Sequence, residues 1–259
     1  MVDYSFSLEV FEHFLLVLVR IVSFVAVAPF FSIRGIPNMT KAGFAAVLSI
    51  MVLLVKEPAE LSYVSVIGYA VAVIKELLVG LLLGFCTYIC NSIILLAGNL
   101  IDMDIGLSMV SEFDPTMNTQ ITVTGNLYFY FYMTILLAIN GHQFLMRALC
   151  DSFDVIPLGG AIFDMNDLFE SIVLFFTNLF VLAFRIMLPV FAAMLILNVV
   201  LGVMAKVAPQ MNMFAVGVQI KIITGFVILM AMIILFPQVV TIVADQMKIN
   251  LRSITEGLL

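Results

Sequence analysis

The sequence has few charged residues and no tryptophan. Only 11% of its 259 residues are charged and 64% are hydrophobic, whereas a typical soluble domain is about a quarter charged and about half apolar. A water-soluble fold of this size would lack the polar side chains needed to cover its surface. The composition therefore excludes a soluble enzyme and predicts an all-α, polytopic membrane protein, in which each span needs about 20 apolar residues.

Basic tracts and catalytic motifs are also missing. The net charge is −6 without a cluster of Lys and Arg, which excludes nucleic acid as a partner, because a phosphate backbone is bound by clustered basic side chains. There is no GxxxxGK[ST] or GxGxxG loop and no GxSxG elbow, and the three cysteines lack zinc or redox spacing. His13 and His142 are isolated, and Asp102 and Asp104 are expected to be solvated loop charges. We therefore expect no catalytic residue, no cofactor and no metal site.

Apolar segments predict about five to seven helical elements. They cover approximately residues 14–31, 42–55, 61–74, 77–101, 121–139, 172–205 and 214–244. Two of these segments, 42–55 and 61–74, have only about 14 residues and are expected to be buried or re-entrant helices. The two longest exceed one straight crossing and contain Pro189 and Pro237, where kinks or breaks are expected. The segment 140–171 is predicted to be a loop.

Polar side chains occur in the middle of several apolar segments. They are Arg20, Lys75, Glu76, Arg185, Asn198 and Lys221. Each costs free energy if it faces lipid, so we expect these side chains to face protein or water.

Small and polar residues also recur at every fourth position, which places them on one helix face. These sets are Gly80 with Gly84, then Asn198, Gly202 and Lys206, and finally Gly217, Lys221 and Gly225. Such faces pack helices together in membranes. Two explanations of this pattern remain open: the faces pack against other helices of the same chain, or they contact other subunits.

Residues 105–118 join two apolar segments but mix Gly, Pro and carboxylates with Met109, Phe113 and Met117. A lipid-exposed coil of this kind would leave backbone groups unpaired. A loop inserted into a protein-lined cavity avoids that cost, because flexible Met and bulky Phe side chains can fill a lumen that must also open. An ordinary external loop is the alternative.

A series of short motifs covers nearly the whole chain. They are Arg20 through Pro29 and on to Ile36-Pro37, then Ala97-Gly98, Ile101-Asp102-Met103 with Gly106, Phe113-Asp114-Pro115, Ile156-Pro157-Leu158-Gly159, and Ala208-Pro209-Gln210-Met211-Asn212-Met213-Phe214 followed by Val216-Gly217 and Gln219-Ile220-Lys221-Ile222. The last block is the most specific. With these motifs the chain resembles the FliR family, the R subunit of the flagellar type III protein-export gate, whose relatives serve virulence injectisomes.

The resemblance implies kinked helical hairpins assembled side by side in a hetero-oligomeric export gate. Within a single membrane domain, 1–259, about 1–170 would be a P-subunit-like part that contains a plug loop at 105–118, and about 171–259 would be a Q-subunit-like hairpin. The partners would be the P and Q subunits, the B subunit that switches substrate specificity, unfolded export substrates and membrane lipid. The location would be the bacterial inner membrane at the flagellar basal body, with part of the assembly on the periplasmic side.

The resemblance also implies a structural channel and gate subunit without enzymatic activity, required for export of flagellar rod, hook and filament proteins and for flagellum assembly. The plug would include Gly106, Met109, Phe113, Asp114, Pro115 and Met117. Assembly and packing would use Arg20, Pro29, Pro37, Gly80, Gly84, Arg185, Asn198, Pro209, Gln210, Asn212, Gly217 and Lys221. The alternatives are the homologous injectisome subunit and a secondary transporter of a small solute. A transporter should show paired broken helices in two equivalent halves, and the sequence contains no convincing internal repeat.

Overall fold

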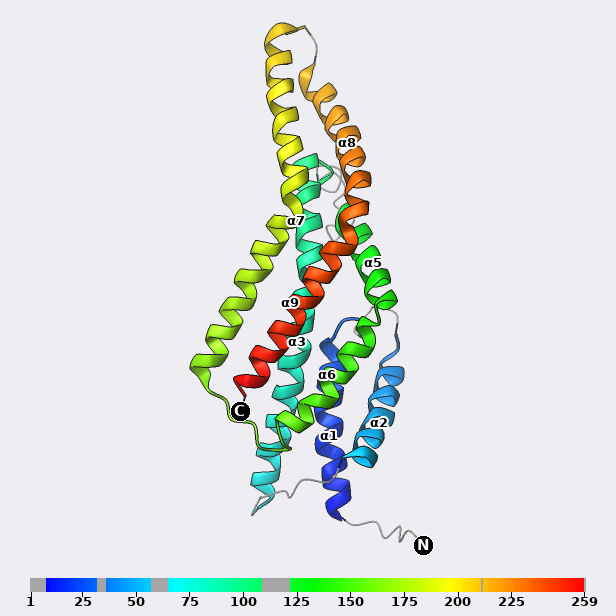
Figure 1. Ribbon diagram of the computed structural model, residues 1–259, viewed down its shortest axis with the longest axis vertical. Helices are drawn as coiled ribbons and strands as arrows, with labels where there is room; N and C mark the ends of the chain where they lie inside the picture. The colour runs from blue at the N-terminus through cyan, green and yellow to red at the C-terminus, as the bar shows by residue number, and fades with distance from the viewer. Residues whose placement is uncertain (1–7, 32–35, 57–64, 109–121, 211, 259) are drawn as a thin grey trace. The chain divides into compact units, whose positions relative to one another are not determined.

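The computed structural model describes residues 8–31, 36–56, 65–108, 122–210 and 212–258. Within these ranges the regular structure is helical, without strands. The helices are α1 (Leu8–Val27), α2 (Asn38–Val55), α3 (Val66–Ile105), α5 (Val123–Ala138), α6 (Gly141–Val155), α7 (Met165–Val207), α8 (Met213–Met232), the short 3₁₀ helix η1 (Ile233–Leu235) and α9 (Phe236–Glu256) (Figure 1). Five helical stretches in the described part are long and apolar enough to cross a membrane, which confirms the predicted polytopic all-α class.

Helix α3 is longer than the sequence predicts. It runs for 40 residues and joins the segments 61–74 and 77–101, so the prediction of a separate short helix over 61–74 is wrong. Lys75 and Glu76 do not interrupt the helix, because their charged groups are bound by other parts of the chain. Lys75 Nζ donates to the carbonyl oxygen of Gly159 at 3.3 Å, and Glu76 accepts hydrogen bonds from Arg20 and Gly159.

The prediction of a loop over 140–171 holds only for residues 156–164, because α7 begins at Met165 and residues 141–155 form the amphipathic helix α6. Its buried face carries Leu145, Leu149 and Ser152, while Arg147 and Asp151 are exposed. This spacing of about four residues is the period of a helix that lies on a protein surface. The charges that suggest a loop are therefore the solvent-facing side of a helix.

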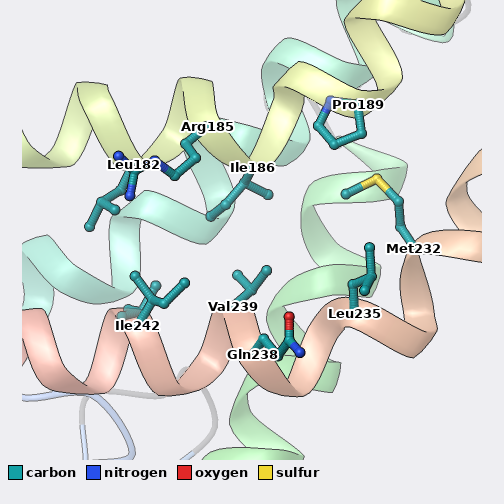
Figure 2. A pocket seen from close by; sticks show the side chains of 10 residues that line it. Leu182, Arg185, Ile186, Pro189, Met232, Leu235, Gln238, Val239 and Ile242 are labelled. Atoms are coloured by element: carbon teal, nitrogen blue, oxygen red, sulfur yellow. The ribbon is translucent and has the colours of Figure 1, made fainter.

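The two longest segments respond differently to their prolines. α7 remains helical through Pro189, and Figure 1 shows its axis changing direction between its yellow-green and yellow parts, as expected for an internal proline. Figure 2 shows Pro189 on α7 opposite Met232. The segment 214–244 is broken by η1, and Pro237 lies in the first turn of α9, where its missing N–H is not needed. The predicted kink and break are both confirmed.

The chain forms two compact units. The first comprises Met1–Ile89, Asn140–Phe175 and Gln246–Leu259, and the second comprises Cys90–Ile139 and Phe176–Asp245. Each unit has its own apolar core. The first includes Leu16, Ile21, Phe24, Leu83, Leu149 and Ile254, and the second includes Ile94, Ile101, Leu136, Val190, Met194 and Val240. The division of the chain near residue 170 into P-like and Q-like parts stays a prediction.

Candidate functional site

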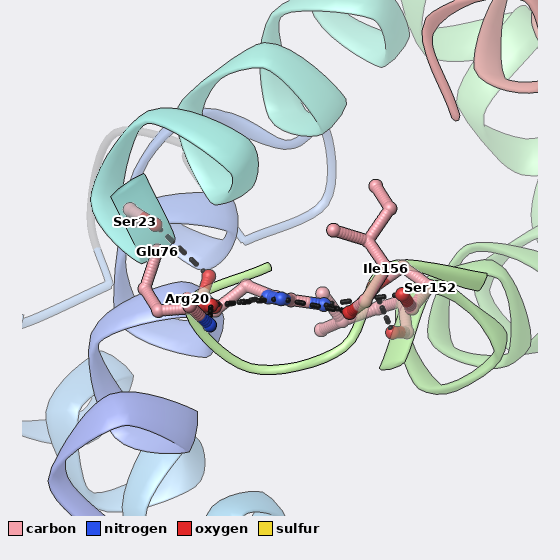
Figure 3. Close-up of polar contacts among 7 residues, drawn as sticks. Arg20, Ser23, Glu76, Ser152 and Ile156 are labelled. Carbon is pink, nitrogen blue, oxygen red and sulfur yellow. Dashed lines mark hydrogen bonds and ion pairs between the residues drawn. The ribbon is translucent and has the colours of Figure 1, made fainter. Parts of the chain in front are cut away.

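Arg20 of α1 is fully buried in the first unit, and every nitrogen of its guanidinium donates a hydrogen bond. Its guanidinium forms a two-pronged ion pair with the Glu76 carboxylate of α3, in which Nη2 donates to Oε1 at 3.0 Å and Nε donates to Oε2. Nη1 also donates to the carbonyl oxygens of Ser152 and Ile156 at 3.1 and 3.0 Å, and Nη2 donates to Ile156 at 3.1 Å (Figure 3). A guanidinium has five N–H groups, so these contacts use its full donor capacity.

The same cluster holds the turn formed by residues 156–159. Oε1 of Glu76 accepts a hydrogen bond from the backbone N–H of Gly159 at 2.8 Å. Gly159 has a φ of +72°, a left-handed conformation that glycine adopts without a Cβ penalty. The charged pair therefore fixes the Ile156-Pro157-Leu158-Gly159 motif against α1 and α3. In the sequence, Arg20 and Glu76 are two separate charges in the middle of apolar segments. Because they lie 56 residues apart, no local pattern shows that they form an ion pair.

Gly80 and Gly84 pack α3 closely against α1. A Cβ atom at Gly80 would overlap Ser23 Oγ and the carbonyl oxygen of Arg20, and one at Gly84 would lie 3.1 Å from the carbonyl oxygen of Phe24. This pair is therefore a helix-packing surface within the first unit. It brings α3 close enough for Glu76 to reach Arg20.

The ends of the segment 105–118 are described in the second unit. α3 ends at Ile105, followed by Gly106 with a φ of +93°, a left-handed conformation that favours glycine. Asp102 is buried, and its two carboxylate oxygens accept the backbone N–H of Thr124 at 3.2 and 3.1 Å. The prediction of a solvated loop charge at Asp102 is therefore wrong: the residue lies on α3 and binds the first turn of α5. The other five plug candidates, Met109, Phe113, Asp114, Pro115 and Met117, lie outside the described residues.

The candidates on α7 and α8 differ in their surroundings. Asn198, Gly202 and Lys206 are all exposed, and a Cβ atom at Gly202 would meet nothing within 4 Å. Gly217 of α8 is buried, and a Cβ atom there would lie 3.6 Å from Leu201 Cδ1. Lys221 interacts electrostatically with Asp104. The polar face of α7 is thus uncovered in the described chain, whereas that of α8 makes contacts inside it.

The remaining candidates mark the ends of helices. Asn212 caps α8 through a 3.4 Å hydrogen bond from Ala215 N to its Oδ1, and Pro37 precedes α2. Pro29 is buried just after α1, while Pro209 and Gln210 are exposed between α7 and α8. The motif residues around Pro209 therefore end one arm of a hairpin and begin the next. Their role in assembly stays a prediction.

Arg185 lines an apolar groove of the second unit. The groove has a volume of about 180 Å³ and is bounded by Leu182, Arg185, Ile186 and Pro189 of α7 and by Met232, Leu235, Gln238, Val239, Ile242 and Val243 from the end of α8 through the start of α9. Figure 2 shows these two sets of side chains on facing helices. The sequence shows Arg185 as a charge inside an apolar segment but does not reveal the groove. The residues of its two walls lie about 50 positions apart along the chain.

The polar contacts of the described residues pack and cap helices within the chain. None of their His, Cys, Asp and Glu side chains form a group of three or more that could hold a metal ion. The described part has long apolar helices, a buried ion pair and two glycines at which α3 comes into close contact with α1. These features define a polytopic membrane protein in which polar and small residues organise helix packing. The chain belongs to the bacterial export proteins, family 1, whose family model matches residues 11–247.

Individual relatives agree with this assignment. The chain is 30% identical over 227 residues to the flagellar biosynthetic protein FliR of Bacillus subtilis (strain 168), with 86% of each chain covered. It is 32% identical over 224 residues to FliR of Aquifex aeolicus (strain VF5), covering 85% of this chain and 86% of the relative. A shorter match, 31% identical over 147 residues and covering 57% of this chain and 56% of the relative, is to the surface presentation of antigens protein SpaR of Shigella flexneri. The resemblance to FliR is therefore confirmed.

Proposed function

We propose that the chain is a structural channel and gate subunit of the flagellar type III protein-export apparatus, required for export of rod, hook and filament proteins. The observation that carries this proposal is membership of the bacterial export family together with similarity to flagellar biosynthetic proteins across about 85% of the chain. Several polar side chains of the described part, namely Arg20, Glu76, Asp102 and Asn212, are engaged in helix packing and capping, which suits a scaffold.

Exposed apolar faces support a hetero-oligomer. Only 22% of the most apolar window of α7 is buried within the chain, and Val199, Val203 and Val207 are 60%, 60% and 79% exposed. A 43-residue helix is roughly 65 Å long, about twice the hydrocarbon thickness of a bilayer. Lipid alone therefore cannot cover this helix, and protein must cover the rest. We assign this role to the P, Q and B subunits, in the bacterial inner membrane with part of the assembly on the periplasmic side.

The segment 105–118 is proposed to be the plug. The mixture of Met109, Phe113 and Met117 with turn-forming residues supports this role, as does the resemblance to the family. Deleting residues 106–117 should increase small-molecule leakage through the assembled gate, measured as uptake of a membrane-impermeant dye. Leakage equal to that of the wild type would show that this segment is not a plug.

Genetic replacement tests the proposed function as a whole. Deleting the gene in the source bacterium should abolish filaments and stop secretion of hook and filament proteins, and a plasmid copy should restore both. The protein should also copurify with the P and Q subunits. Normal filaments in the deletion strain would refute the proposal, and solute flux through vesicles that contain this chain alone would favour the secondary transporter.

The match to SpaR supports one other candidate, the homologous injectisome subunit. The flagellar assignment is preferred because that match spans 57% of this chain, whereas the flagellar relative of Bacillus subtilis covers 86%. The proteins that disappear from the culture medium on deletion separate the two: loss of secreted effectors with intact flagella would identify the injectisome branch.

A further inference from the structure

Arg185 differs from Arg20 and Lys221, two other basic side chains that lie inside the candidate membrane spans. Arg20 is paired with Glu76, and Lys221 interacts with Asp104. Arg185 is exposed near the middle of α7 and has no hydrogen-bonding or ion-pair partner among the residues that the structure describes. A guanidinium next to apolar surface gains free energy from an anion with oxygen acceptors.

The length of α7 indicates where that anion would come from. Arg185 and Pro189 divide the 43 residues into two parts, each close to the length of one bilayer crossing. Whichever part crosses the hydrocarbon, the middle of the helix lies near its boundary. The opposite wall has the same arrangement, because η1 separates α8, of 20 residues, from α9, of 21 residues. The boundary is the depth at which phospholipid phosphates lie, and Arg side chains extend toward it.

The groove beside Arg185 suits an acyl chain better than a small solute. Eight of its ten lining residues are apolar, with Arg185 and Gln238 as the exceptions. Its volume of about 180 Å³ is below the roughly 300 Å³ at which pockets for small molecules begin. An acyl chain needs only partial enclosure because the rest of it can remain in the bilayer. The Gln238 amide adds a neutral donor and acceptor on the other wall.

We propose that this groove binds one anionic phospholipid, with its phosphodiester at Arg185 and part of an acyl chain between α7 and α9. The site lies wholly within the second unit, and its existence does not depend on the proposed export function. The lipid neutralises the mid-helix charge and fills the gap left where both arms of the hairpin change direction.

Native mass spectrometry of the purified full-length protein, together with any subunits that accompany it, tests the site. The sample is titrated with palmitoyl-oleoyl phosphatidylglycerol or with the matching zwitterionic phosphatidylcholine. The wild type should retain the anionic lipid preferentially. Arg185→Gln should weaken its retention about tenfold, as expected for the loss of one charge-assisted hydrogen-bonded contact, while Arg185→Lys should preserve the preference. Arg147→Gln is the matched control, because Arg147 is exposed on α6 and lies outside the candidate spans.

Val239→Phe provides a test that leaves the charge in place. The larger ring should fill the apolar wall and lower retention of the anionic lipid, and this variant decides the question if Arg185→Gln fails to accumulate. Equal retention of the two lipids by the wild type, or unchanged retention in Val239→Phe, would refute the proposal. Loss of a copurifying subunit from Arg185→Gln with lipid retention unchanged would show that the groove is a protein interface.

Discussion

Gly98 of α3 packs directly against the backbone of Gly125 of α5, so closely that a Cβ atom on Gly98 would overlap the Cα atom of Gly125. Two helices approach in this way only where both lack side chains. The contact lies one turn before Asp102, whose carboxylate binds Thr124. Small residues and a buried cap therefore hold together the two helices that flank the segment 105–118.

Gly98→Ala should destabilise the second unit by about 1–3 kcal/mol, because backbone atoms cannot move aside as a flexible side chain can. Gly202→Ala is the control: a Cβ atom there meets nothing within 4 Å, and alanine favours a helix by about 1 kcal/mol over glycine. Thermal unfolding of the purified protein should show a lower midpoint for the first variant and an unchanged or higher one for the second. Equal midpoints would mean that the two helices do not meet at Gly98.

Glu76→Gln should be far more damaging than the loss of a surface charge. It leaves the Arg20 guanidinium buried without a counter-charge, which costs about 3–5 kcal/mol. Arg252→Gln, which removes an exposed pair with Glu256, should cost about 0.5 kcal/mol or less. Accumulation in membranes and the unfolding midpoint measure both effects.

Exchanging the two charges, as Arg20→Glu with Glu76→Arg, should fail to restore stability. Arg20 also donates to the carbonyl oxygens of Ser152 and Ile156, and a carboxylate at position 20 would repel them. Recovery of the wild-type midpoint in the double variant would show that only the ion pair matters and not the contacts with the 152–156 backbone.

Asp102→Ala should release the first turn of α5. Removing a helix cap costs about 0.5–2 kcal/mol, and amide hydrogen exchange of residues 123–126 should become faster. Asp164→Ala is a matched change, since the exposed Asp164 accepts from Asn166 N at 2.8 Å beside the start of α7, and it should accelerate exchange only there. Unchanged exchange at the start of α5 in Asp102→Ala would contradict the capping role.

The extent to which the fold follows from the sequence depends on the range of each interaction. Hydropathy and proline positions predict the helices and the break before Pro237, because both act locally. The joint expected at Lys75 and Glu76 is wrong because these charges are bound by residues more than 50 positions away, which no local pattern reveals. The loop expected over 140–171 is wrong over 141–155 because a polar helix with one narrow apolar face resembles a loop in composition. The groove at Arg185 is missed for the same long-range reason.

Cys150 should react slowly with maleimide at neutral pH. Burial raises the pKa of its thiol above the ordinary value of about 8.5, Asp151 and Asp154 raise it further, and Lys56 opposes the shift. Since the thiolate is the nucleophile, alkylation should accelerate as the pH rises from about 7 to 9. Lys56→Gln should slow the reaction and Asp154→Asn should accelerate it, as followed by mass spectrometry. Buried Cys86 and Cys90 are internal controls, and a rate at Cys150 that is independent of pH would contradict the shift.

The order in which the chain is synthesised has a consequence for the buried ion pair. Arg20 leaves the ribosome 56 residues before Glu76 and 136 residues before Ile156, so at about 5–20 residues per second its counter-charge follows roughly 3–11 s later. During that interval α1 can enter the membrane on the strength of its apolar majority, with an unpaired guanidinium that disfavours insertion by about 2.5–3.5 kcal/mol. Helix α1 is therefore made before its partners but reaches its final surroundings late, since its arginine stays incompletely bound until the chain has been extended past residue 156.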